Sequence, residues 1–217
     1  MFSITTIIIA VTCITSFIAF SNQKLMDDLI FYPPAVTNQN QWYRFVTCGF
    51  IHADIAHLGF NMYSFYMFGQ AIENSFIDIY GTSGKAMYIL LYISSLFVCL
   101  LPTYFKNKDN YHYKSLGASG AVSAIVFAYI FLSPLQGIGL IIIPGLHAPA
   151  FIFGFIYLGV SVYLARRGNS YINHSAHLWG AIYGIVFLIV TSLVFTDFNP
   201  LSNFIYQVQY YFKGLSS

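Results

Sequence analysis

The sequence predicts an all-α membrane protein, a six-transmembrane-helix bundle with a long first connection. Only 7% of the 217 residues are charged and 58% are hydrophobic, whereas a soluble domain carries about 25% charged residues. Six segments also approach the roughly 20 apolar residues that a helix needs to cross a bilayer. So little charge cannot cover a water-facing surface, and the lipid bilayer is therefore the expected solvent for much of the chain.

The six expected spans follow one another without a domain boundary, so residues 1–217 are expected to form a single membrane domain. The first span has no preceding basic stretch and is longer than the apolar run of a secretory signal, which predicts that it is retained. The connection from Ser21 to Ile55 is long enough to be folded or functional in its own right. The apolar stretch Pro134–Leu146 is expected to dip into the membrane interface. The spans are expected at about 3–20, 56–74, 84–104, 117–133, 148–166 and 175–196.

Polar side chains gather at the starts of three of these spans, where lipid would make them costly unless they are paired or functional. His52, His57 and Asn61 open the second span, Ser119 opens the fourth, and His177 opens the sixth. Alternate spans of a six-span chain begin on the same membrane face. The three groups are therefore expected at one face and at similar depth, with both chain termini on the opposite side.

These residue types fit acyl-transfer chemistry. A serine hydroxyl needs a base within hydrogen-bond reach to become a nucleophile, and His177 is the natural base for Ser119 because imidazole titrates near neutral pH. His57 and Asn61 are four residues apart and share one helix face, so they could stabilise an oxyanion together with the Ser119 N–H. Each residue also has a plainer interpretation, since serines in small-residue stripes pack helices and single histidines or asparagines form interhelical hydrogen bonds.

Small residues supply a way to bring the two helices together. Gly120, Ala124 and Ala128 form a stripe on the fourth span, and Gly180 and Gly184 form a GxxxG motif on the sixth, beginning three residues after the histidine. Such stripes allow membrane helices to approach closely. Packing by the small residues is therefore expected to deliver the serine hydroxyl to the histidine.

Other site classes find little support. The histidines lack an HExxH pattern or a carboxylate partner, so no metal and no cofactor is expected. The net charge of +2 is too small to indicate a nucleic-acid partner. The cysteines Cys13, Cys48 and Cys99 are isolated and are expected to be buried apolar residues.

Four motifs, spread over nearly the whole chain, resemble those of the rhomboid family of intramembrane serine proteases and occur in the same order. Each motif is unspecific alone, and the order of the four makes the resemblance specific. They are QWYRFVT (Gln41–Thr47), HADIAHLGFNMYSFYMFGQAIE (His52–Glu73), GASGAVSA (Gly117–Ala124) and AHLWGAIYG (Ala176–Gly184).

The resemblance implies a rhomboid-like fold whose first loop lies partly in the membrane, and an endopeptidase that cleaves single-span membrane proteins with a Ser–His dyad. It assigns catalysis to Ser119 and His177, and oxyanion stabilisation to the Ser119 N–H, His57 and Asn61. Supporting positions are His52, Gly117, Gly120, Gly180, Gly184, Trp42 and Arg44. Substrates are thought to enter beside the second and fifth spans of this family.

Two rival functions stay open. A non-catalytic rhomboid relative would bind transmembrane segments without cleaving them, although such relatives typically lack the serine or the histidine and this chain keeps both. A small membrane transporter could use His57 and His177 as a polar pathway, but the short chain and the expected lack of intramembrane carboxylates argue against it. The sequence indicates neither the substrate nor the oligomeric state.

Three features depart from the family pattern: a long basic third loop, a few extra residues between Glu73 and Gly84, and Trp179 where a smaller residue is common. The expected location is the plasma (inner) membrane of a prokaryote. The orientation that the resemblance implies puts the active face outside, against the positive-inside rule, because most cations lie on the active face: Lys24, Arg44, Lys106, Lys108, Lys114, Arg166 and Arg167.

Overall fold

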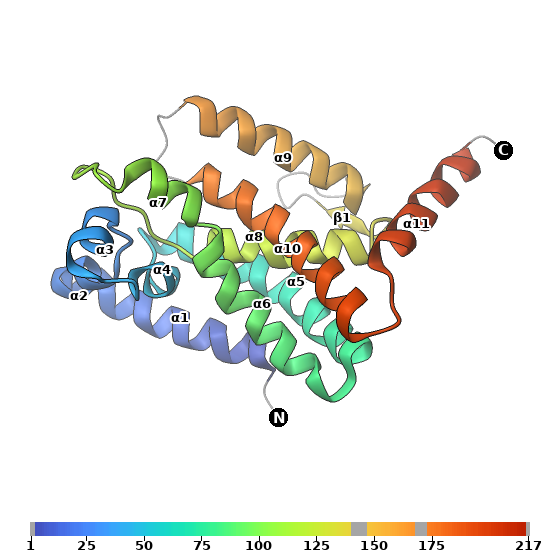
Figure 1. The fold of residues 1–217 in the computed structure, drawn as a ribbon, viewed down its shortest axis with the longest axis horizontal. Helices are drawn as coiled ribbons and strands as arrows, with labels where there is room; N and C mark the ends of the chain where they lie inside the picture. Colours follow the sequence, from blue (N-terminus) through green and yellow to red (C-terminus); the bar gives the residue numbers. More distant parts are fainter. Residues whose placement is uncertain (1–2, 140–146, 168–172, 216–217) are drawn as a thin grey trace.

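The computed structural model describes residues 3–139, 147–167 and 173–215, and it confirms the expected helical bundle. Helices lie at all six positions where the sequence predicts spans (Figure 1). They are α1 (Ile4–Ser21), α5 (Ile55–Tyr80), α6 (Gly84–Val98), α8 (Ser119–Leu132), α9 (Ala150–Arg167) and α10 (His174–Phe195).

Three helical stretches in the described chain are long and apolar enough to cross a membrane: Ile4–Ser21, Ile55–Asn107 and His174–Phe195. The stretch Ile55–Asn107 contains both α5 and α6. The apolar parts of α8 and α9, Ser119–Leu132 and Ala150–Tyr163, are shorter. These stretches place the chain in a membrane. The number of six crossings remains a prediction.

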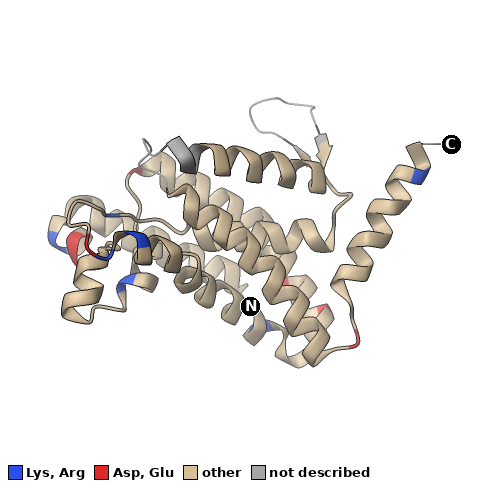
Figure 2. Cartoon of the chain, turned by 45° about the horizontal axis from the view of Figure 1, so that its top comes forward, with Lys and Arg blue, Asp and Glu red and all other residues tan. Residues whose placement is uncertain are grey.

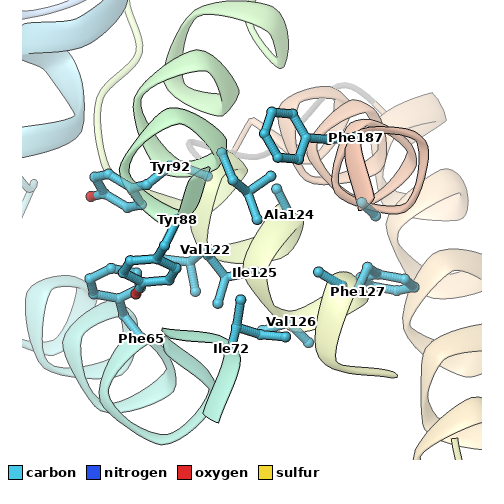
Figure 3. Packing of buried hydrophobic residues seen from close by; sticks show 14 of the residues in the cluster. Phe65, Ile72, Tyr88, Tyr92, Val122, Ala124, Ile125, Val126, Phe127 and Phe187 are labelled. Carbon is cyan, nitrogen blue, oxygen red and sulfur yellow. The ribbon is translucent and has the colours of Figure 1, made fainter. Parts of the chain in front are cut away.

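Helix α8 lies at the centre of the bundle. It contacts α5, α6, α9 and α10. Most of its own side chains are small or apolar and are buried on all sides of the helix, as is typical of an interior helix. Figure 3 shows Val122, Ile125 and Val126 of α8 among side chains of neighbouring helices, including Phe65, Ile72 and Tyr88. The helix that begins with Ser119 is thus the most enclosed element of the fold.

The long first connection is folded, as its length predicts. It forms three short helices and a 3-10 turn: α2 (Gln23–Leu29), α3 (Pro33–Gln39), α4 (Arg44–Thr47) and η1 (Cys48–Phe50). Together with α7 (Leu101–Asn107) it occupies the end of the bundle where the charged residues gather (Figure 2). Asp27 and Lys114 form an ion pair of 3.2 Å that ties this connection to the segment before α8. A hydrogen bond from Gln23, together with one from Lys114, lowers the pKa of Asp27.

The prediction of a third span over 84–104 is wrong at its C-terminal end. Helix α6 ends at Val98, and α7 starts a new helix at Leu101. In a continuous helix the N–H of residue 102 would bond to the carbonyl of Val98, and Pro102 has no N–H to donate. The second span is longer than expected, because α5 continues to Tyr80 and absorbs most of the extra residues before the turn η2 (Gly81–Ser83).

Two features of the C-terminal half were not anticipated. Strands β1 (Gly137–Gly139) and β2 (His147–Pro149) pair antiparallel between α8 and α9. Most of the stretch expected to dip into the interface, residues 140–146, lies outside the described residues. An amphipathic helix, α11 (Pro200–Leu215), follows α10 and extends away from the bundle (Figure 1).

Candidate active site

Ser119 is the first residue of α8, directly after a tight turn. Gly117 in this turn has φ of +107°, a conformation that L side chains rarely adopt, and its N–H donates to the carbonyl of Cys48 at 2.9 Å. The first N–H groups of a helix have no intrahelical partner, and in the described chain we see no hydrogen bond from the Ser119 N–H. The serine therefore combines a half-buried hydroxyl with a free backbone donor.

His52 holds this turn in place. The Ala118 N–H donates to His52 Nε2 at 3.4 Å, so the proton of the neutral ring is on Nδ1, which lies 3.0 Å from Ser16 Oγ. The Ser16 hydroxyl donates in turn to the carbonyl of Phe50 at 3.0 Å. Burial, with a contribution from the neighbouring His57, lowers the pKa of His52 to about 3 and keeps the ring neutral. The supporting role expected for His52 thus has a physical basis in this chain of bonds.

His57 packs against the same turn. A Cβ built on Gly117 would lie 2.7 Å from His57 Cε1 and 3.0 Å from Nε2, and the rings of His52 and His57 are 5.0 Å apart, edge to face. Asn61 is buried one turn further along α5, and its amide donates to the carbonyl of His57 at 3.0 Å. One amide hydrogen of Asn61 is therefore occupied by its own helix, and the second remains for another acceptor.

Glycines allow α10 to lie directly against α8, at the ends where Ser119 and His177 are located. A Cβ built on Gly180 would lie 2.0 Å from the carbonyl oxygen of Gly120, and one on Gly184 would lie 2.1 Å from that of Ala124. A Cβ on Gly120 would in turn lie 3.3 Å from the Ala176 oxygen. The expected close packing of these two small-residue stripes is confirmed.

His177 is in the first turn of α10, with its ring between two other rings. Its ring centroid lies 6.2 Å from that of Tyr157 of α9, nearly parallel, and 5.6 Å from that of His174. His177 Nε2 is buried, and within the described residues it has no hydrogen-bond partner. The structure accordingly shows no Ser119–His177 hydrogen bond, although the two residues adjoin the contact of Gly120 with Ala176. Catalytic hydrogen bonds are often long or misaligned before substrate binds.

A small cavity adjoins Ser119 on the side of the first connection. Its lining includes Cys48, Cys99, Ser119, Asn173 and Ala176. The cavity therefore reaches both the serine and the beginning of α10.

The other expected positions lie away from Ser119. Arg44 is 6% exposed, and its guanidinium donates to the carbonyls of Asp27 and Ile30, both at 2.7 Å. Trp42 stacks on Phe45 with ring centroids 5.7 Å apart. Trp42 and Arg44 thus hold the first connection together through ring packing and hydrogen bonds to backbone carbonyls.

Trp179, noted as a departure from the family pattern, is 43% exposed. It does not line the cavity beside Ser119. The indole therefore faces the bundle exterior rather than filling the space between the serine and the first connection.

Sequence reasoning missed Ser16, Cys48 and Tyr157 as neighbours of the site. Ser16 gave one signal, because a polar residue in an apolar span is a candidate for an interhelical bond. The contributions of Cys48, through its carbonyl, and of Tyr157, through its ring, depend on the tertiary fold alone.

Comparison with known proteins shows the family of this chain. The family model described as Rhomboid domain matches residues 39–193. RHOMBOID-like protein 12, mitochondrial, of Arabidopsis thaliana is 33% identical over 152 residues, which are 63% of this chain and 42% of the relative. Putative rhomboid protease YdcA of Bacillus subtilis (strain 168) is 28% identical over 160 residues, 74% of this chain and 72% of the relative.

A third relative, Presenilin-associated rhomboid-like protein A, mitochondrial, of Danio rerio, is 24% identical over 144 residues, 66% of this chain and 36% of the relative. The chain thus spans less than half the length of the two mitochondrial relatives and most of the Bacillus one. The family match covers well over half of the chain and includes the turn, the nucleophile candidate and both small-residue stripes. The chain is an integral membrane protein that belongs to the rhomboid family.

Proposed function

We propose that this protein is an intramembrane serine endopeptidase in which Ser119 and His177 form the catalytic dyad. The observation that carries the proposal is the contact of Gly180 with Gly120, which brings the starts of α8 and α10 together. Beside that contact lie a serine N–H and a buried imidazole nitrogen, and neither has a hydrogen-bond partner among the described residues. A buried polar atom without a partner calls for an explanation, and a proton acceptor awaiting the serine hydroxyl and a substrate provides one.

In the proposed reaction Ser119 Oγ attacks a backbone carbonyl carbon of the substrate, and His177 Nε2 takes the hydroxyl proton. The Ser119 N–H, with His57 and the second amide hydrogen of Asn61, faces the oxygen that becomes negative. The C–N bond then breaks as His177 returns the proton to the leaving amine. A water molecule hydrolyses the acyl-enzyme by the same proton route, which restores both residues.

The length of α8 supports cleavage inside the membrane. Its 14 residues rise about 21 Å at 1.5 Å each, whereas the hydrocarbon core is about 30 Å thick. A helix that reaches the opposite face would therefore place Ser119 below the membrane surface. We propose single-span membrane proteins as substrates and the plasma membrane of a prokaryote as the location, with support from the Bacillus relative.

Labelling with a fluorophosphonate probe tests the dyad. Wild-type protein in detergent is expected to label, and both Ser119→Ala and His177→Ala are expected to lose the label. Ser123→Ala is the matched control, because Ser123 is a buried serine of the same helix that bonds to Tyr157 Oη. Circular dichroism and thermal unfolding establish that each variant is folded.

Labelling of folded Ser119→Ala at the wild-type level would overturn the nucleophile assignment. A folded wild type that never labels would overturn the protease proposal. It would favour a relative that binds transmembrane segments without cleaving them.

A further inference from the structure

Helix α11 lies beyond residues 39–193, the part of the chain that the family model matches. It begins five residues after the end of α10 and docks at the end of the bundle opposite Ser119, where α8 ends and α9 begins. Neither the proposed catalysis nor the small-residue packing involves this helix.

One side of α11 attaches to the C-terminal end of α8. The Phe204 ring stacks on that of Phe131 of α8, with centroids 4.6 Å apart and planes 4° apart. The amides of Asn203 and Gln207 both donate to the carbonyl of Leu132, at 3.4 and 3.2 Å. That carbonyl is one of the last four of α8, which have no intrahelical partner. Helix α11 therefore supplies a C-terminal cap for the helix that carries Ser119.

A second side of α11 is apolar and exposed. Residues 201, 205, 208, 212 and 215 follow the spacing i, i+4, i+7, i+11, i+14 and form one stripe. Leu201 and Ile205 are each 45% exposed, and Phe212, which also contacts Phe151 of α9, is 54% exposed. The exposed polar residues Ser202, Gln209 and Lys213 lie on a different side, next to the exposed rings of Tyr206 and Tyr210. The helix thus has separate docked, apolar and polar sides.

The position of the apolar stripe indicates what covers it. The outward side of α10 carries a run of exposed apolar residues, Val186, Val190, Leu193, Val194 and Phe195, that would face acyl chains. The short linker of residues 196–199 joins this lipid-facing surface to the stripe on α11. Figure 1 shows α11 running across the direction of α10 rather than continuing it. Where α10 spans the bilayer, a helix in this position would lie along the membrane boundary instead of crossing it.

We propose that α11 is an interfacial helix that binds the lipid surface on the face opposite the candidate active site. Its apolar stripe would lie among the upper acyl segments, with Ser202, Gln209 and Lys213 toward headgroups and water. This arrangement is typical of amphipathic helices in a membrane interface. Through its bonds to Leu132, lipid-bound α11 sets the depth at which α8 ends. The occupant of the stripe is lipid, not a second protein.

Spin labels on the two exposed sides of α11 test this proposal without reference to catalysis. Single cysteines at Leu201 and Ile205 report on the apolar side, and matched cysteines at Ser202 and Gln209 report on the polar side. The half-buried native thiol is removed by Cys13→Ala, while Cys48 and Cys99 are buried. The full chain is reconstituted into phosphatidylethanolamine–phosphatidylglycerol vesicles, and collision rates with oxygen and with a water-soluble nickel chelate are measured by electron paramagnetic resonance.

We expect labels at Leu201 and Ile205 to collide mainly with oxygen, which concentrates in lipid, and labels at Ser202 and Gln209 to collide mainly with the nickel chelate. Equal access of the chelate to both sides would overturn the proposal. Shielding of the Ile205 label from both reagents, with spin–spin broadening, would also overturn it in favour of contact between two copies. Each labelled variant must unfold at the wild-type temperature. Two pairs of positions are compared, Leu201 with Ser202 and Ile205 with Gln209, so that one pair still tests the proposal if a label disturbs the other.

Discussion

A Cβ on Gly180 would lie 2.0 Å from the carbonyl oxygen of Gly120, so α10 and α8 touch through bare backbone one turn after His177 and one residue after Ser119. No residue larger than glycine fits at position 180 unless the helices move apart. The distance between the two catalytic candidates is therefore set by these glycines.

Gly180→Ala is expected to separate α8 from α10 and to destabilise the protein. Overpacking a close contact typically costs about 1–3 kcal/mol, and fluorophosphonate labelling of Ser119 should fall because His177 moves with α10. Gly159→Ala is the matched control, since a Cβ on Gly159 of α9 would meet nothing within 4 Å. Thermal unfolding in detergent and labelling rates measure both effects. Equal melting temperatures for the two variants would show that the contact at Gly180 is loose.

Gly117→Ala is expected to reduce labelling of Ser119 more than Gly81→Ala does. Both glycines have positive φ, +107° and +57°, so both variants should lose stability from backbone strain alone. Only at Gly117 would the new Cβ meet another residue, His57 Cε1 at 2.7 Å, whereas Gly81 has open space. Labelling rates normalised to the folded fraction measure the difference. The same loss of labelling in both variants would contradict a role for the His57–Gly117 contact.

Glu73→Ala is expected to destabilise the attachment of α1. The buried carboxylate of Glu73 accepts the N–H groups of Ile4 and Thr5, at 2.8 and 2.9 Å, and the Thr5 hydroxyl at 2.8 Å. Each donor left unpaired in a buried site costs about 1–3 kcal/mol, so the melting temperature should fall strongly. Asp78→Ala on the exposed side of the same helix is the control. Unchanged protease resistance and melting of Glu73→Ala would show that α1 is held by apolar packing instead.

Acid is expected to weaken the turn before Ser119 through His52. The folded-state pKa of about 3 lies below the ordinary value of 6.5, so the unfolded chain binds a proton at this histidine that the folded chain does not. Stability should be unaffected by this group above pH 6.5 and should fall from there toward pH 3, by at most about 1.4 kcal/mol per pH unit for one proton.

The difference in unfolding free energy between wild type and His52→Gln, measured from pH 7.5 to 5, isolates this contribution from the other histidines. Gln can still accept the Ala118 N–H, so the variant is expected to fold. A pH-independent difference would mean that His52 keeps an ordinary pKa.

Much of this fold is readable from the sequence because hydropathy and small-residue spacing are local properties. The composition and the long apolar runs predict a membrane bundle, and helices are found at all six expected positions. The GxxxG of Gly180 and Gly184 likewise predicts close packing, because a helix stripe without side chains admits only another backbone. The expected end of the third span failed where Pro102 interrupted a run that hydropathy alone would have continued.

Only the tertiary structure decided which groups meet. The Gly117 conformation depends on bonds to Cys48 and His52 from a distant connection, and the N-terminus of α1 depends on a carboxylate about 70 positions away. The sequence likewise did not predict that Arg44 is buried against backbone carbonyls or that α11 docks on Leu132. The spacing of residues in the sequence predicts which side chains share a helix face. It does not predict which other helix packs against that face, because the packed helices are far apart in the sequence.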